Sequence, residues 1–271
     1  MMIAETESTT VNKLEKVFSN LKTKGKKAFV PFNLLGYPTE EECLKSLLAL
    51  IEGGATALEL GIPFSDPIAD GPLIQQASHA VLENGFTVDQ ALKIVEAVKN
   101  KHPQIPMTIL TYFNIALARG TTQFLKDLKR AGAAGVTFVD LPVEEFEEVH
   151  GKILESGLAP VMLISPLTPE DRLEKILKYA RGFLYLISRA GTTGMQESYH
   201  DQLKDRILKI KSKSSLPVLV GFGISTPEQA ASMIKLGADG VIVGSKVIDL
   251  ISSKRSQELG SYTETMVRAI N

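Results

Sequence analysis

The chain has 271 residues, of which 44% are hydrophobic, so it can bury a large core and is not expected to be disordered. Its 30 basic and 31 acidic residues leave a formal net charge of −1, which gives no indication of a nucleic-acid or anionic-membrane partner. One cysteine excludes an internal disulfide, and the lack of a secretory signal or of an apolar run near the ~20 residues that span a bilayer predicts a cytoplasmic protein.

Short apolar segments rich in Val, Ile and Leu recur along the chain, and each is followed by a helical pattern. This alternation predicts a parallel sheet whose two faces are both covered. A closed barrel fits the count better than a doubly wound sheet, which usually has fewer strands and a dinucleotide fingerprint that is absent here. We therefore predict a single (β/α)8 TIM barrel over residues 1–271. The predicted strands are 28–32, 57–62, 107–112, 136–140, 160–164, 183–187, 217–220 and 240–243.

Helix signals support this alternation. Thr39 precedes three glutamates and Thr226 precedes a proline, as expected at helix N-termini. We expect extra helices at the N-terminus, after strand two at residues 73–82, and after strand eight. Pro31 disfavours the first strand, because proline cannot donate a ladder hydrogen bond. The connections after strands two and six are the longest, and active sites in such barrels lie on the loops that follow strands.

The second predicted strand opens the segment that is richest in acidic residues. Leucines alternate with Glu59, and the bulky face of a barrel strand meets the helices, so Glu59 is predicted to point into the barrel. Burying an ionised carboxylate there costs free energy unless it has hydrogen-bond or charge partners. Its pKa is therefore expected to be raised, which suits the group to proton transfer. A structural glutamate held by hydrogen bonds would give the same pattern. Asp66 and Asp70 follow and favour a site, although Asp66 is also typical of a turn.

Glycines follow the last three predicted strands, at residues 191–194, at 221–223 and at Gly244. Glycines let backbone N–H groups approach an anion, and Ser245 opens a short helix whose N-terminus favours negative charge. The loops after strands seven and eight form the recurring phosphate site of such barrels, although glycines also serve as plain turns. The four histidines are scattered and none ends a strand, so no metal site is predicted.

From Leu58 the chain reads LELGIPFSDPIADGP, which resembles the signature of the tryptophan synthase alpha subunit family. This acidic segment is the most specific part of the resemblance, whereas GFGIS and VGS occur more widely in phosphate-binding barrels. Further matches follow in family order: AFVPF from Ala28, ILTYFN from Ile109, VDLPVEE from Val139, YLISRAGTTG from Tyr185, GFGIS from Gly221 and VGS from Val243.

The resemblance implies a lyase that cleaves indole-3-glycerol phosphate to indole and glyceraldehyde 3-phosphate by a retro-aldol reaction. It implies that Glu59 is the general acid–base and that Asp70 accepts the indole N–H and stabilises positive charge on the ring. Thr193 belongs to a loop, residues 189–200, which we expect to close over substrate and to bring Thr193 to Asp70. The implied substrate-binding residues are Phe32, Leu110, Tyr185, Thr193, Gly194, Gly223, Gly244 and Ser245.

The resemblance also implies a partner, the beta subunit of tryptophan synthase, in an αββα heterotetramer. Pyridoxal phosphate would belong to that partner, and no cofactor is expected in this chain. Asp66, Asn114 and Pro142 would lie on the interface side. The family usually has Gly-Asp-Pro after the first strand, whereas here residues 33–38 read NLLGYP, which puts that loop and its communication with the partner in doubt.

Three alternatives remain at the level of sequence. A sugar-phosphate isomerase or epimerase would explain the glycine loops but not the carboxylates of the second strand. A stand-alone lyase would share the chemistry without the partner, although Asn114 and Pro142 favour the complex. A non-catalytic barrel that serves only as an allosteric partner is disfavoured, because Glu59 and Asp70 are both present.

Overall fold

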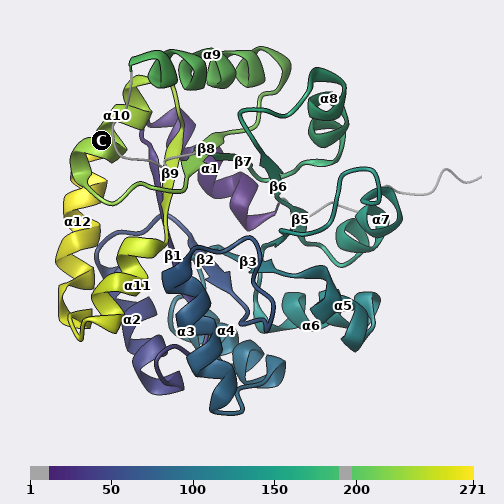
Figure 1. Cartoon of the computed structure of the whole chain (residues 1–271), viewed down its shortest axis with the longest axis vertical. Coiled ribbons are helices and arrows are strands. Elements are labelled where there is room, and N and C mark those ends of the chain that lie inside the picture. Colours follow the sequence, from purple (N-terminus) through teal and green to yellow (C-terminus); the bar gives the residue numbers. More distant parts are fainter. Residues whose placement is uncertain (1–11, 189–196) are drawn as a thin grey trace, which may run out of the picture.

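The computed structural model describes residues 12–188 and 197–271, which form a ring of parallel strands surrounded by helices (Figure 1). The strands neighbour one another in the order β5-β4-β3-β2-β1-β9-β8-β7-β6, and every pair is parallel, as predicted. They are β1 (Ala28–Leu34), β2 (Leu58–Gly61), β3 (Met107–Thr111), β4 (Gly135–Phe138), β5 (Ala159–Pro160), β6 (Met162–Ile164), β7 (Leu184–Ile187), β8 (Val218–Gly221) and β9 (Gly240–Val243).

β5 and β6 are two parts of one barrel strand. The chain was predicted to form a single strand over 160–164, but it changes partner at Val161, so that β5 pairs with β4 and β6 pairs with β7. The Val161 N–H still donates to the Val136 carbonyl at 3.0 Å, so pairing toward β4 continues through the break. The sheet starts with β5 and ends with β6, and these two segments are consecutive in the chain, so together they close the ring as one strand. The ring then has eight strands, and the predicted eight-stranded barrel is confirmed.

β1 joins the beginning of the barrel to its end. Ala28 pairs with Gly240 of β9, whereas all other neighbouring strands within the described residues are consecutive in the chain. β1 also extends to Leu34, two residues beyond its predicted end, and Pro31 lies within it opposite Val243. The unfavourable proline is thus accommodated in the strand.

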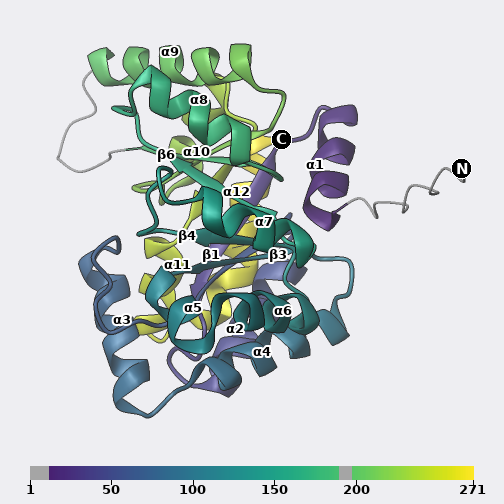
Figure 2. The same cartoon turned by 90° about the vertical axis from the view of Figure 1, so that its right-hand side faces the viewer.

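Helices form the outer layer (Figures 1 and 2). The extra helices expected at the N-terminus, after strand two and after strand eight are present as α1, α3 and the pair α11 and α12. β3 is also followed by two helices, which the sequence pattern did not indicate. The helices are α1 (Lys13–Thr23), α2 (Glu40–Glu52), α3 (Pro72–Glu83), α4 (Val88–Lys101), α5 (Phe113–Arg119), α6 (Thr121–Ala131), α7 (Glu147–Glu155), α8 (Glu170–Tyr179), α9 (Glu197–Lys213), α10 (Pro227–Lys235), α11 (Ser245–Ser252) and α12 (Leu259–Ile270), with a short 3-10 helix at Ser256–Glu258.

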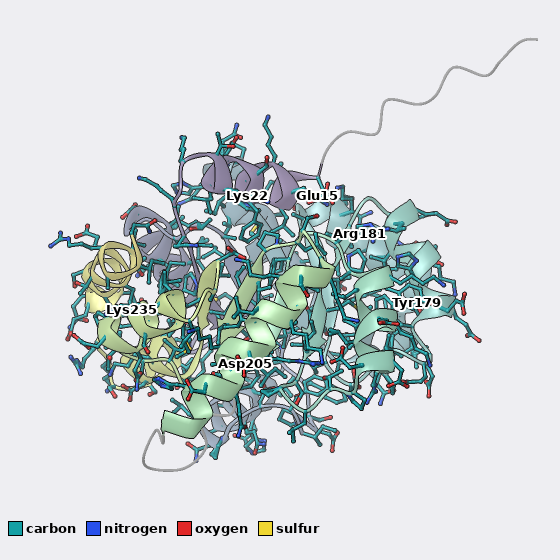
Figure 3. All side chains as sticks on the ribbon, turned by 90° about the horizontal axis from the view of Figure 1, so that it is seen from above. Glu15, Lys22, Tyr179, Arg181, Asp205 and Lys235 are labelled. Atoms are coloured by element: carbon teal, nitrogen blue, oxygen red, sulfur yellow. The ribbon has the colours of Figure 1, made fainter. Side chains whose placement is uncertain are left out.

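The helices begin where the sequence indicated and carry polar side chains outward. The Thr39 side chain accepts a hydrogen bond from the Glu42 N–H, and Thr226 forms a capping box with Gln229. Charged side chains such as Lys235 project from the outer layer (Figure 3). No helix within the described residues combines the length and the apolar character that a bilayer crossing requires.

One end of the barrel is closed by α1. The Phe18 ring packs on Phe183 of the barrel interior, with ring centroids 5.4 Å apart. Leu14 is fully buried, and its Cδ1 lies 2.9 Å from where a Cβ on Gly135, the first residue of β4, would stand. Since α1 occupies the end at which the strands begin, the end at which they finish is left for a site, as in other barrels of this type.

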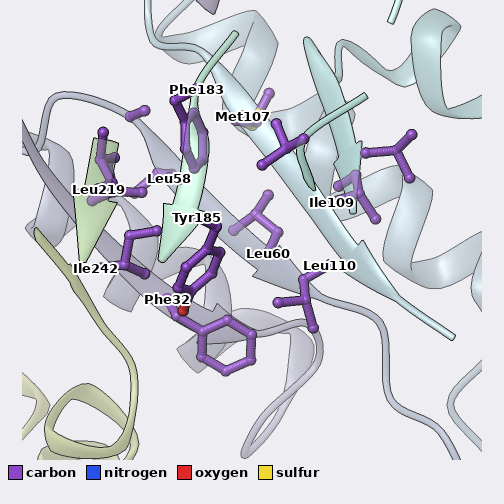
Figure 4. Packing of buried hydrophobic residues seen from close by; sticks show 14 of the residues in the cluster. Phe32, Leu58, Leu60, Met107, Ile109, Leu110, Phe183, Tyr185, Leu219 and Ile242 are labelled. Carbon is purple, nitrogen blue, oxygen red and sulfur yellow. The ribbon is translucent and has the colours of Figure 1, made fainter. Parts of the chain in front are cut away.

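The register of the strands defines the inner face. Residues paired across parallel strands share a face, so Phe32 and Glu59 lie in one layer. A Cβ on Gly61, two residues after Glu59, would lie 2.6 Å from the Phe32 ring, which places both layers inside the barrel. Figure 4 shows Phe32, Tyr185 and Leu110 gathered toward one end of the strands.

Candidate active site

Glu59 of β2 points into the barrel, as its alternation with leucines predicted. The residue is 1% exposed, and its Oε1 atom has no hydrogen-bond partner among the described residues. Burial, and secondarily the nearby charge of Asp70, raises the pKa of the Glu59 carboxyl to about 8. The carboxyl is therefore largely protonated at neutral pH and is able both to donate and to accept a proton. A glutamate fixed by a complete set of hydrogen bonds would not have this environment.

Asp70 lies in the loop between β2 and α3, two residues before α3 begins. The Tyr112 hydroxyl donates to Asp70 Oδ2 at 2.9 Å and accepts from the Ala69 N–H at 3.0 Å. The Phe64 ring stacks on Tyr112 with centroids 4.7 Å apart and holds it in place. Burial raises the pKa of the Asp70 carboxyl, and the hydrogen bond from Tyr112 opposes that rise. The two carboxyls thus occupy different environments: Glu59 Oε1 has no hydrogen-bond partner among the described residues, whereas Asp70 Oδ2 accepts a hydrogen bond from Tyr112.

Tyr112 has a role that the sequence analysis did not assign. The useful signal was its place at the end of β3, because β3 pairs with β2 and their C-terminal ends therefore lie together. A phenol there is within reach of a carboxylate that follows β2.

Tyr185 of β7 lies across the interior from β2. It is 4% exposed, and a Cβ on Gly221 of the neighbouring β8 would stand 2.7 Å from its hydroxyl oxygen. Burial raises the pKa of Tyr185 well above its usual value, and the charges of Glu59 and Asp70 raise it further. Tyr185 is therefore a neutral hydroxyl that shares the interior with both carboxyls. The glycine at position 221 makes room for its ring.

Two glycine loops end the neighbouring strands β8 and β9. After β8 the backbone takes positive φ at Phe222 (72°) and Gly223 (77°). After β9, Gly244 precedes α11, and a Cβ on it would lie 3.2 Å from the Phe32 ring. Gly223, Gly244 and Ser245 therefore lie on adjacent loops at the open end of the barrel. Thr193 and Gly194, with the rest of residues 189–196, lie outside the described residues.

Ser188, which the sequence analysis missed, supports the loop after β8. It is 3% exposed, and its hydroxyl donates to the Gly221 carbonyl at 2.8 Å and lies in hydrogen-bond contact with the Phe222 carbonyl. The Ser188 N–H also donates to the Gly221 carbonyl at 2.8 Å. These contacts fix the strand end from which Phe222 and Gly223 turn. No pattern in the sequence points to them.

Exposed residues with few polar partners surround part of the same end of the barrel. Asp66, Asn114 and Pro142 are exposed on the segments after β2, β3 and β4, so the three predicted interface residues share one face. Ile68 and Leu167, in the loops after β2 and β6, are 82% and 79% exposed. A cavity of about 310 Å³ is bounded by residues 138–143, which include Pro142, and by β6 and α8. Across residues 12–188 and 197–271, no cluster of His, Cys, Asp and Glu suited to a metal ion is found.

Comparison with known proteins places this arrangement in a family. The family model described as "Tryptophan synthase alpha chain" matches residues 18–269. A tryptophan synthase alpha chain from Methanoregula boonei is 37% identical over 265 residues, which cover 96% of this chain and 98% of the relative. One from Escherichia coli (strain SMS-3-5 / SECEC) is 41% identical over 241 residues, covering 89% and 90%.

Solved structures agree with the sequence comparison. The crystal structure of tryptophan synthase subunit alpha from Legionella pneumophila str. Paris is 35% identical and superposes with a TM-score of 0.88, covering 96% of this chain and 99% of that one. The family model, the relatives and this structure all extend over nearly the whole chain. The chain therefore belongs to the tryptophan synthase alpha chain family and is a lyase of tryptophan biosynthesis that cleaves indole-3-glycerol phosphate.

Proposed function

We propose that Glu59 and Asp70 carry out this cleavage. Glu59 in its neutral form protonates the indole ring carbon that bears the side chain, and the resulting carboxylate takes the proton from the adjacent side-chain hydroxyl. The bond between the ring and the side chain then breaks: its electron pair returns to the ring as indole forms, and the hydroxyl carbon becomes the aldehyde of glyceraldehyde 3-phosphate. The observation that carries the proposal is the buried Glu59 carboxyl, whose pKa of about 8 lets one group serve both transfers near neutral pH.

Asp70 has the complementary task. Protonation of the ring carbon leaves positive charge on the ring, centred on its N–H, and a carboxylate beside that N–H stabilises the charge. The Tyr112 hydroxyl, 2.9 Å from Asp70 Oδ2, favours the ionised form and leaves the other carboxylate oxygen available for the ring. The two carboxyls therefore divide the chemistry by their environments, one holding a proton and one holding a charge.

The remaining residues position the substrate. Phe32 and Leu110 supply apolar contact for the ring, and the Tyr185 hydroxyl lies toward the glyceryl chain. Gly223, Gly244 and Ser245 hold the phosphate through backbone N–H groups and the N-terminus of α11. Thr193 and Gly194 are assigned to the same task on the resemblance alone.

The cleavage is tested by measuring indole release from indole-3-glycerol phosphate by the purified chain. Glu59→Gln should lower turnover by about 10²–10⁴-fold, and Asp70→Asn by about 10²–10³-fold. The matched control is Glu83→Gln, which removes an exposed carboxylate of α3 that pairs with His79. Near-normal turnover by Glu59→Gln, or equal losses in all three variants, would contradict the assignment.

We further propose that the chain binds the beta subunit of tryptophan synthase, as an αββα heterotetramer in which that partner holds pyridoxal phosphate. The exposed apolar side chains Ile68 and Leu167 support the location of the contact, because they lie at the same end of the barrel as Asp66, Asn114 and Pro142. This end also carries the active site, so the product indole would be released toward the partner.

Co-sedimentation of the purified chain with a beta subunit tests the association. Leu167→Asp should weaken binding by at least tenfold, because it places a charge in an apolar contact. Leu208→Asp, at a 52% exposed leucine on α9, is the control and should bind normally. If the unaltered chain cleaves substrate but does not sediment with the beta subunit, the stand-alone lyase is the better description.

A further inference from the structure

A buried hydroxyl on the inner face of β4 has no partner. Thr137 is 1% exposed, and its Oγ1 makes no hydrogen bond within the described residues. It stands in register with Leu110 of β3, and Leu110 in turn with Gly61 of β2. Gly61 faces the interior, because a Cβ there would meet the Phe32 ring at 2.6 Å. Thr137 therefore faces the barrel interior from the strand beside Leu110.

The absence of a partner distinguishes Thr137 from a comparable threonine. Thr108 of β3 also lies in a buried strand, and its hydroxyl donates to the Leu58 carbonyl at 3.3 Å. A threonine in this sheet can thus satisfy its hydroxyl on a neighbouring strand, and Thr137 does not. A buried hydroxyl without a partner lowers stability, so its presence beside a ligand site indicates a polar group that the site receives.

This step rests on the proposed function. If indole-3-glycerol phosphate is the substrate, the position of β4 in the barrel identifies which part of it reaches Thr137. The phosphate lies at the loops after β8 and β9, which are the seventh and eighth strands of the barrel. β4 is the fourth strand, and in a closed ring of eight it stands opposite the eighth. A substrate anchored by its phosphate there extends its ring toward β3 and β4. Thr137 and Leu110 therefore face the benzo edge of the ring, beyond the N–H that Asp70 receives.

We propose that Thr137 is a specificity-determining residue and that the site accepts indole-3-glycerol phosphates with a hydroxyl group on the benzo ring. Leu110 and Phe32 supply the apolar wall for the ring, and Thr137 supplies one hydrogen bond at its edge. A ring hydroxyl would donate to or accept from Oγ1, whereas a methyl group of similar size would leave Oγ1 unsatisfied.

The experiment measures kcat/KM for the unsubstituted substrate and for pairs of substrates that carry a hydroxyl or a methyl group at ring positions 4, 5, 6 or 7. For each ring position, the kcat/KM of the hydroxyl substrate is divided by the kcat/KM of the methyl substrate, and this hydroxyl-to-methyl ratio cancels the effect of substituent size. For at least one position, Thr137→Val should lower this ratio by about 2- to 10-fold, the contribution of one neutral hydrogen bond. Thr137→Ser, which retains the hydroxyl, should restore it.

Thr111→Val is the matched control. Thr111 is also buried with an unpartnered hydroxyl, but it is the next residue after Leu110 and so lies on the opposite face of β3. Its substitution should leave all four ratios unchanged. The proposal is wrong if Thr137→Val changes no ratio by as much as twofold, or if Thr111→Val changes them equally, while the unaltered chain cleaves unsubstituted substrate. Failure to cleave that substrate would instead refute the proposed function, and this inference with it.

Discussion

Replacing Glu59 by glutamine should make the protein more stable and less active, and the gain in stability should depend on pH. The pKa of the Glu59 carboxyl is about 8 in the folded protein, against an ordinary value of 4.5. Between these two values the folded chain holds a proton that the unfolded chain has released. The free energy of unfolding therefore falls as pH rises through this window, and the loss is complete above pH 8.

The size of the effect follows from the same two values. One pKa unit corresponds to 1.36 kcal/mol. Relative to low pH, where the carboxyl is protonated in both the folded and the unfolded chain, the free energy of unfolding is therefore lower by about 1 kcal/mol at pH 5, about 3 kcal/mol at pH 7 and about 5 kcal/mol at pH 9. Glutamine does not titrate, so Glu59→Gln should lack this slope. The advantage of the variant over the unaltered chain should grow by about 4 kcal/mol between pH 5 and pH 9.

Urea unfolding at pH 5, 7 and 9 measures the difference. Asp127→Asn is a control of opposite sign: Asp127 is also a buried carboxylate, but it pairs with Arg119 at 2.7 Å and Arg130 at 2.7 Å. Burial raises the pKa of Asp127, but the hydrogen bonds from Arg119 and Gln123 and the charges of Arg119 and Arg130 together outweigh burial and lower it. Asp127→Asn should therefore destabilise the protein near neutral pH. Parallel pH profiles for Glu59→Gln and the unaltered chain would refute the reasoning.

Three further predictions concern the residues around the carboxyls. Tyr112→Phe removes the donor to Asp70 Oδ2, so the pKa of Asp70 should rise, and the acidic limb of the pH–rate profile should move to higher pH; an unmoved limb would show that Tyr112 does not act on Asp70. Gly221→Ala places a Cβ 2.5 Å from the Tyr185 ring and 2.7 Å from its hydroxyl oxygen, so thermal stability and turnover should both fall; adding Tyr185→Phe removes only the hydroxyl contact and should therefore recover only part of the stability. Ser188→Ala removes the side-chain contacts to the Gly221 and Phe222 carbonyls and keeps only the backbone N–H bond to Gly221, so the dissociation constant of glycerol phosphate, measured by calorimetry, should rise about 3- to 10-fold; unchanged affinity would separate Ser188 from the phosphate loop.

The sequence was sufficient for those features that depend on local patterns. Alternating strands and helices predicted the barrel, and the leucines around Glu59 predicted its inward orientation, because both depend only on the period of the strand and the covering of the sheet. The pairing of Tyr112 with Asp70 and of Ser188 with the Phe222 carbonyl could not be predicted in the same way. Each joins residues at least 34 positions apart, and which hydroxyl meets which acceptor depends on the final packing.

Two local details also escaped the sequence analysis. The partner change at Val161 splits a segment that reads as one apolar strand, because the apolar pattern carries no information about which neighbour each residue pairs with. Asn33 was noted only as part of an unusual loop. It is fully buried, and neither polar atom of its side chain has a partner among the described residues.

The pairing of β1 with β9 has a consequence for how the chain is made. β1 begins at Ala28 and must wait for Gly240 before its second edge can be paired, a distance of 212 positions. At about 5–20 residues per second, the interval between synthesis of the two strands is about 10–40 s. During that interval a growing half-barrel presents a bare apolar edge, which is the kind of surface that aggregates or recruits chaperones. The ribosome-bound chain should therefore be most dependent on chaperones just before β9 is released.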